Sequence, residues 1–224
     1  RAAERGELVS DAGPRRQALV EVYNEASICE RCPLSETRNR VVFGSGNADA
    51  DLMFVGEAPG AEEDRQGLPF VGRAGGFLTE LLQSIGLNRE DAFVANVLKC
   101  RPPGNRDPQP EEIDSCRPYL EQQVQLIEPR VICTLGNFAT KLLTANPTGI
   151  TKVRGVPQQH LIGGRFVFLL PLFHPAAGLR TPRVADQLRE DFRQIPDLLA
   201  QPVPQPEPLV QPDPEPDQIG LFGD

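Results

Sequence analysis

Four cysteines are spaced in a way that suits a metal ion or an iron–sulfur cluster. Cys29 and Cys32 form a Cys-x2-Cys pair, and Cys100 and Cys116 follow later in the chain. Two thiolates on one tight turn can bind the same metal ion or the same face of a cluster. The spacing leaves open a zinc site, a [4Fe–4S] cluster and unligated buried cysteines. The fifth cysteine, Cys133, lies in an apolar stretch, so we expect it in the core.

A glycine-rich segment, Gly56-Glu57-Ala58-Pro59-Gly60, follows a short apolar stretch. A turn of this kind can point backbone N–H groups at an anion or at the polar edge of a base. An ordinary structural turn is the alternative interpretation. Glu57 is the carboxylate nearest to the site that such a turn would form.

Three further side chains predict a pocket for a nucleobase. His174 follows the last predicted strand, where it can donate a hydrogen bond to a developing anion, whereas His160 lies within an alternating strand. Phe70 lies in a loop and Asn96 ends a strand, and an aromatic ring with an amide can stack on and read a base. Each of the three alone also fits a packing or capping role.

Basic residues gather on the same predicted loops, where they are typical of a rim that contacts nucleic-acid phosphates. An ordinary solvated surface is the alternative. These residues are Arg65, Arg73, Lys99, Arg101, Arg106, Lys152, Arg154, Arg180 and Arg183.

Strands that alternate with helices must position these side chains. Apolar stretches predict strands at 51–56, 92–98 and 130–135 and a hairpin at 160–171, and helical spacing predicts helices at 14–27, 74–86, 118–127, 137–144 and 184–199. This order predicts an α/β fold with a mainly parallel sheet. Because ligand sites in such sheets lie beyond the carboxyl ends of the strands, we expect the loops with Glu57, Asn96 and His174 to meet there.

Composition excludes several classes of protein. The chain has 224 residues, of which 39% are apolar, and contains no apolar stretch long enough to span a membrane. Five cysteines are too few for a disulfide scaffold, so we expect a cytoplasmic protein. The net charge of −8 argues against a nucleic-acid partner, but residues 201–224 hold five carboxylates and no base. The rest of the chain, with 23 basic and 26 acidic side chains, has a net charge of only −3.

The chain divides into one domain and two tails. We expect a flexible lead at 1–13, a globular domain at 14–200 and a disordered linker at 201–217, which carries seven prolines. The last residues, 218–224, return to apolar and amide side chains, which is unusual for a segment that only ends the chain.

The order of the motifs resembles the family-4, iron–sulfur uracil-DNA glycosylases across roughly residues 17–199. The resemblance rests on the four cysteines, Val42-Phe43-Gly44, Gly56–Gly60, Gly67–Gly72, Asn96–Pro103, Val153-Arg154-Gly155 and His174–Ala177. It implies a three-layer α/β/α fold around a mainly parallel four-stranded sheet. It also implies a [4Fe–4S] cluster, rather than zinc, held by Cys29, Cys32, Cys100 and Cys116.

The reaction implied by the resemblance is hydrolysis of the N-glycosidic bond of deoxyuridine in DNA by a monofunctional glycosylase. Phe70 would stack on the extruded uracil, Asn96 would pair with its edge, and His174 would donate to its O2. The alternative is an iron–sulfur protein that binds nucleic acid without turnover.

Further roles also follow from the resemblance. Gly56 and Ala58 would contact the base, and Glu57 would position water or stabilise the sugar cation, with Glu63 in reserve. Leu179 or Arg180 would fill the gap in the base stack. Phosphates would be contacted by basic side chains of the rim, namely Arg73, Lys99, Arg101, Lys152 and Arg154.

The tail resembles the short motif that binds bacterial sliding clamps. The match comprises Gln218, Ile219, Leu221 and Phe222 at the end of the proline-rich linker. A tether of this kind would raise the effective concentration at replicating DNA. We expect a monomer whose partners are uracil-containing DNA and this clamp, with no membrane partner.

Overall fold

One six-stranded sheet in the order β1-β3-β2-β4-β6-β5 organises the chain. The structure, a computed structural model, describes residues 12–203. Four neighbouring strands are parallel, namely β3 (Ala92–Asn96), β2 (Leu52–Gly56), β4 (Val131–Leu135) and β6 (Arg165–Leu172). This confirms the predicted α/β fold and its mainly parallel sheet. Two antiparallel edge strands, β1 (Ser45–Gly46) and β5 (Gln158–Ile162), extend the four-stranded core.

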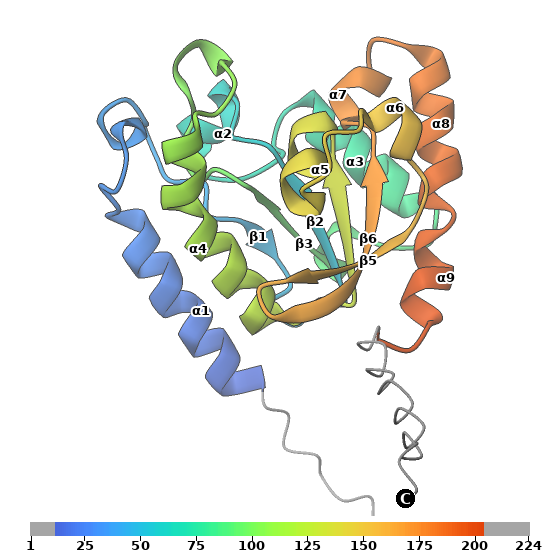
Figure 1. The fold of residues 1–224 in the computed structure, drawn as a ribbon, viewed down its shortest axis with the longest axis horizontal. Helices are drawn as coiled ribbons and strands as arrows, with labels where there is room; N and C mark the ends of the chain where they lie inside the picture. The colour runs from blue at the N-terminus through green and yellow to red at the C-terminus, as the bar shows by residue number, and fades with distance from the viewer. Residues whose placement is uncertain (1–11, 204–224) are drawn as a thin grey trace, which may run out of the picture.

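Helices cover both faces of the sheet and form three layers (Figure 1). One face packs against α1 (Ala12–Ser27), α4 (Pro110–Ile127) and α5 (Asn137–Thr144). The other packs against α3 (Arg73–Gln83), α8 (Pro182–Phe192) and α9 (Ile195–Ala200). Successive strand residues alternate between the two layers, as the pleat requires, so Met53 faces the first layer and Phe54 the second.

The remaining short helices lie in the connections. They are α2 (Ala61–Gln66), α6 (Ile150–Val153) and α7 (Pro175–Gly178), with 3₁₀ turns η1 (Pro33–Glu36), η2 (Arg89–Asp91) and η3 (Pro103–Asn105). Figure 1 shows α2, α6 and α7 at the upper edge, where the arrows of the parallel strands end. These connections therefore surround the edge at which a parallel sheet binds ligands.

The predicted hairpin at 160–171 forms between β5 and β6. Its turn residues Gly163 and Gly164 have φ angles of 55° and 77°. Two consecutive positive φ angles are typical of the tight turn that matches strand twist, and glycine adopts them without steric cost.

Two helix boundaries differ from prediction because of prolines. The helix predicted at 118–127 begins at Pro110, so Pro118 lies within α4 and Cys116 lies on this helix rather than before it. The helix predicted at 184–199 divides into α8 and α9. Pro196 has no N–H to continue the hydrogen-bond pattern of α8, and it occupies the first turn of α9 instead.

The terminal predictions fall largely outside the described residues. The predicted lead at 1–13 overlaps them only at Ala12 and Gly13, which belong to α1. Most of the predicted linker and the whole motif at 218–222 lie beyond residue 203. Between residues 12 and 203, none of the helices combines the length and the apolar character needed to cross a membrane.

Candidate functional site

A cavity of about 470 Å³ opens at the edge where β2, β3 and β6 end. The three loops predicted to converge all contribute to its wall. Glu57 and Ala58 come from the loop after β2, Asn96 ends β3, and His174 follows β6. Phe70, from the connection between α2 and α3, completes this group. The structure thus brings the predicted ring, amide, imidazole and carboxylate into one pocket.

Asn96 and Phe70 meet above the backbone of Gly56. A Cβ atom on Gly56 would lie 2.3 Å from Oδ1 of Asn96 and 3.1 Å from the Phe70 ring. No other residue type can occupy this position without displacing one of the two. The absence of a side chain at Gly56 is therefore what allows the amide and the ring to converge.

Phe70 is held in a left-handed backbone conformation, with φ of 54°. Such an angle is uncommon outside glycine and persists only where the surroundings impose it. Nη2 of Arg89 donates to the Pro69 carbonyl at 3.1 Å. On the other side, a Cβ atom on Gly75 would lie 1.6 Å from the Phe70 carbonyl oxygen, so α3 approaches this loop as closely as a glycine permits.

The His174 imidazole stacks against the Phe70 ring, with 5.5 Å between centroids and 24° between planes. The backbone N–H of Ala176 donates to Nδ1 of His174 at 3.1 Å, so the side chain caps α7. A ring nitrogen that accepts a hydrogen bond carries no proton, so the neutral imidazole has its proton on Nε2. Burial, assisted by the charge of Arg180, lowers the pKa of His174 to about 4. Near pH 7 the side chain is therefore a neutral donor.

Two carboxylates line the cavity. Burial, with a smaller effect from the charge of Asp107, raises the pKa of Glu57. Glu63 projects from α2, and its Oε2 lies 2.7 Å from the position that a Cβ on Gly60 would take. Both candidates named from the sequence thus reach the same pocket.

Most of the predicted DNA-contacting residues lie at the surface around this edge. Arg73, Lys152, Leu179 and Arg180 are exposed, and Arg180 also lines the cavity. Arg101 is half-buried, and its Nε donates to Oδ1 of Asn105 at 2.7 Å. The cavity wall also includes Asn105 and Arg106, and of these the sequence analysis missed Asn105, although it follows Cys100 closely in the chain.

Two basic residues do not fit the predicted rim. Lys99 is 1% exposed, so its ammonium does not reach solvent, and burial lowers its pKa to about 8. The prediction that Lys99 contacts DNA is wrong. The Arg154 side chain is 15% exposed, and its Nη1 donates to Asp191 at 3.1 Å. Arg154 also lies over the Phe173 ring, so we replace the predicted phosphate contact with this internal ion pair.

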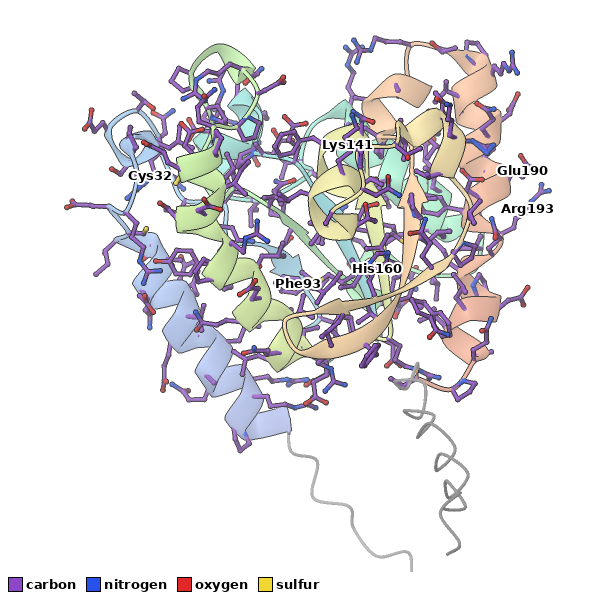
Figure 2. The ribbon with its side chains drawn as sticks, viewed as in Figure 1. Cys32, Phe93, Lys141, His160, Glu190 and Arg193 are labelled. Atoms are coloured by element: carbon purple, nitrogen blue, oxygen red, sulfur yellow. The ribbon has the colours of Figure 1, made fainter. Side chains whose placement is uncertain are left out.

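The four predicted ligand cysteines line a second, smaller hollow, between α1, the 99–100 segment and α4. Figure 2 shows Cys32 on the side of the molecule formed by α1 and α4, opposite Glu190 on α8 and Arg193 just after this helix. Burial raises the pKa of Cys32 and Cys116 and raises that of Cys100 to about 12. Thiolates at these positions therefore require a compensating positive charge, such as a metal centre supplies. Cys133 is fully buried in β4, as predicted.

Hydrogen-bond donors point at these sulfur atoms. The Lys99 backbone N–H donates to Sγ of Cys116 at 3.2 Å, and Nη1 of Arg38 donates to Sγ of Cys100 at 3.7 Å. Tyr119 lines the same hollow, and its buried hydroxyl has no hydrogen-bond partner between residues 12 and 203. Donors to sulfur are a common means by which proteins tune iron–sulfur clusters. The sequence analysis missed Arg38 and Tyr119 because nothing in their local pattern distinguishes them.

The four cysteines form a set of thiol donors that suits a metal centre. Within residues 12–203, no three His, Cys, Asp or Glu side chains are close enough together to hold a single metal ion. The four cysteines nevertheless share one hollow, and thiols are the donors that bind zinc and iron–sulfur clusters alike.

Comparison with known proteins gives a consistent result. Residues 43–196 match the family model described as Uracil DNA glycosylase superfamily. The chain is 43% identical over 192 residues to the Type-4 uracil-DNA glycosylase of Archaeoglobus fulgidus, covering 84% of this chain and 96% of that protein. It is 48% identical over 167 residues to the Type-4 uracil-DNA glycosylase of Thermotoga maritima, covering 74% and 85%. A Type-5 uracil-DNA glycosylase of Mycobacterium leprae is more distant, at 29% identity over 80% of this chain and 96% of that protein.

Proposed function

Because this chain belongs to the type-4 uracil-DNA glycosylases of the uracil DNA glycosylase superfamily, we infer that it hydrolyses the N-glycosidic bond of deoxyuridine in DNA. The reaction releases uracil and leaves an abasic site, which makes the protein a hydrolase of DNA repair. The observation that carries this inference is the single cavity in which Phe70, Asn96 and His174 converge.

The target base must leave the helix before it can react. The glycosidic bond of a stacked nucleotide is out of reach, so the nucleotide is flipped into the cavity at a cost of a few kcal/mol. We propose that the Phe70 ring stacks on the flipped uracil, which offsets roughly 1–3 kcal/mol of that cost. The exposed Leu179, next to the cavity residue Arg180, is suited to fill the gap left in the stack.

Asn96 is proposed to select uracil. Uracil presents an acceptor at O4 beside a donor at N3, whereas cytosine presents the reverse pattern. A carboxamide held in one orientation satisfies the first pattern and leaves buried groups unpaired with the second, which is how polar sites reject near analogues. Gly56 and Ala58 are proposed to contact the base, since Ala58 lines the cavity and Gly56 lies against Asn96 and Phe70.

His174 is proposed to stabilise the leaving uracil anion. Its Nε2–H donates to O2 of the base, on which negative charge develops as the glycosidic bond breaks. The imidazole is neutral near pH 7, so it contributes a fixed hydrogen bond and does not transfer its proton. Glu57 is the proposed carboxylate for positioning the water or stabilising the sugar cation, and Glu63 is the second candidate.

A [4Fe–4S] cluster held by Cys29, Cys32, Cys100 and Cys116 is the proposed cofactor. When bound, the cluster would supply a cross-link between the turn after α1, the segment after β3, and α4. The cross-link closes the long stretch of chain between Cys32 and Cys100, which strongly restrains the unfolded chain. The cross-link also anchors the start of the loop that contributes Asn105 and Arg106 to the cavity.

The proposed DNA contacts are those rim residues that remain at the surface, namely Arg73, Arg101, Lys152 and Arg180. We further propose that the protein acts as a monomer in the cytoplasm, and that the segment from Gln218 to Phe222 binds the sliding clamp. The support for the clamp is the sequence pattern and its position after a proline-rich linker.

One assay tests the activity against the non-catalytic alternative. The protein is incubated with duplex DNA that carries one uracil, and the abasic sites are then cleaved with alkali. We expect a strand break at the uracil and release of the free base, and no break in the same duplex with thymine. DNA binding without release of uracil would overturn the proposed activity.

A further inference from the structure

Lys99 is a buried cation that the mechanism above does not use. Its side chain is among the largest fully buried ones in the described chain. Lysine is almost never fully buried unless its ammonium is paired, because removing the charge from water is costly. The location of such a group three residues after Asn96 therefore calls for a function.

The ammonium of Lys99 joins two parts of the fold. Nζ donates to the Asn96 carbonyl at 2.8 Å and to Oε1 of Gln123, on α4, at 2.6 Å. Nε2 of Gln123 in turn donates to the Phe43 carbonyl at 2.9 Å, and Nζ lies 5.9 Å from the centre of the Phe43 ring. The ammonium thus links the end of β3 to α4, and the Gln123 amide extends this link to the segment at Phe43.

These contacts fix the peptide group between Asn96 and Val97 from both sides. The Val97 N–H donates to the Gly56 carbonyl at 2.9 Å, while the Asn96 carbonyl accepts from Lys99. Asn96 is the last residue of β3, and just beyond it the Leu98 N–H donates to the Glu57 carbonyl at 3.0 Å. A rotation of the peptide would swing the Asn96 side chain, whose Oδ1 already lies against Gly56.

We propose that Lys99 is a positioning residue that fixes the direction of the Asn96 amide and thereby sets the selectivity of the pocket for uracil. The proposal rests on the proposed function of the pocket. Lys99 does not touch the base. It acts by holding the 96–97 peptide, with Gln123 as the anchor that keeps the ammonium in place.

The test is a double-mutant cycle measured as single-turnover release of uracil. Lys99→Met keeps the aliphatic length but removes every donor, and Asn96→Ala removes the amide. In the presence of Asn96, we expect Lys99→Met to slow release roughly 10-fold, about the effect of losing one hydrogen bond to a charged group. In the Asn96→Ala background the same substitution should change the rate less than 2-fold, because coupled residues are not additive.

Two further measurements separate positioning from a general loss of structure. Free uracil should inhibit Lys99→Met about 10-fold more weakly than wild type, while affinity for a duplex without uracil stays unchanged. Lys141→Met makes the same chemical change on α5, at the position labelled in Figure 2, and should leave all these values unchanged. Metal content and the unfolding midpoint are recorded for each variant.

Gln123→Leu keeps the proposal testable if Lys99→Met fails to fold. It removes one partner of the ammonium and should give a smaller effect of the same kind, again absent in the Asn96→Ala background. If wild type releases uracil but the Lys99 or Gln123 substitution slows release equally with and without Asn96, the positioning role is wrong. If wild type releases no uracil, it is the proposed function that fails, and weakened binding of free uracil by Lys99→Met would still support the positioning role.

Discussion

The imidazole of His174 lies stacked on the ring of Phe70, with their centroids 5.5 Å apart. The two residues are more than a hundred positions apart in the chain, and each is fixed by a separate backbone device. His174 is held by the Ala176 N–H, and Phe70 by its left-handed conformation against Gly75. The donor and the stacking surface are thus oriented before any base enters, so little reorganisation is needed when charge develops on the base.

His174→Ala should slow single-turnover uracil release by about 10²–10³, the usual effect of losing one preorganised donor to an oxyanion. The affinity for uracil-containing DNA should change much less, because the lost hydrogen bond strengthens mainly as charge develops. Rapid-quench excision assays and DNA-binding titrations measure the two effects. A rate within 2-fold of wild type would remove His174 from the reaction.

The depressed pKa of His174 predicts a specific loss of stability in acid. Between its ordinary pKa of 6.5 and the folded value of about 4, the unfolded chain binds a proton that the folded protein does not. Stability therefore falls as pH decreases through this range, by about 1.4 kcal/mol per pH unit. Relative to His174→Gln, wild type should lose roughly 2 kcal/mol between pH 7 and pH 5 in denaturant titrations.

The titration of Asp191 changes stability with pH in the opposite direction to that of His174. For this reason wild type must be compared with His174→Gln. Burial raises its pKa from 3.8 to about 6, so between these values the folded protein holds a proton that the unfolded chain has lost. Its contribution to stability increases as pH falls. Because Asp191 is present in both proteins, the difference between wild type and His174→Gln isolates the histidine. A difference that is constant from pH 7 to pH 5 would contradict the assigned burial of the imidazole.

Gly75→Ala should displace Phe70 and reduce uracil release at least 10-fold. Its Cβ would lie 1.6 Å from the Phe70 carbonyl, and backbone at this distance must move. Gly76→Ala is the matched control, since a Cβ there meets nothing within 4 Å. It should retain activity and raise stability by about 0.5–1 kcal/mol through helix propensity. Equal activity of the two variants would show that the position of Phe70 tolerates movement of this loop.

Cys100→Ala should abolish iron and sulfide binding and lower the thermal unfolding midpoint, because it removes a ligand of the proposed cluster. Cys133→Ala removes a thiol that is equally buried but faces the core from β4. It should keep the full iron and sulfide content. Iron and acid-labile sulfide are measured per chain for both variants. Stoichiometric zinc without sulfide in wild type would replace the cluster with a zinc site.

Deletion of residues 217–224 should abolish binding to a bacterial sliding clamp and leave excision on short oligonucleotides unchanged. The side chains proposed to bind and release uracil lie between residues 57 and 180, in the part of the chain that the structure describes, so we expect them to act without this segment. Clamp binding is measured by surface plasmon resonance with the full-length chain as the control. Equal clamp binding by both proteins would reject the motif.

Much of this molecule could be predicted from local patterns. The strands β2, β3 and β4 are buried at every position and stand out in the sequence as short apolar stretches. Because these strands alternate with helices, they form a parallel sheet whose strands all end at the same edge. The loops that carry Glu57, Asn96 and His174 therefore meet at that edge. The order of the motifs indicates the family, whereas the cysteine spacing alone leaves a zinc site, a cluster and unligated cysteines open.

Other properties depend on contacts between distant segments. The sequence predicts Lys99 and Arg154 as part of the rim that contacts DNA, because charge alone does not reveal which side chains a neighbouring helix will cover. Only the packing of α4 and α8 makes Gln123 and Asp191 their partners. Likewise, the proton of His174 is assigned to Nε2 by one backbone N–H and by burial. A hydrophobic pattern lies within one short segment, so it can be recognised in the sequence. The burial of a side chain and the direction of its hydrogen bond depend on distant segments, so only the packed structure decides them.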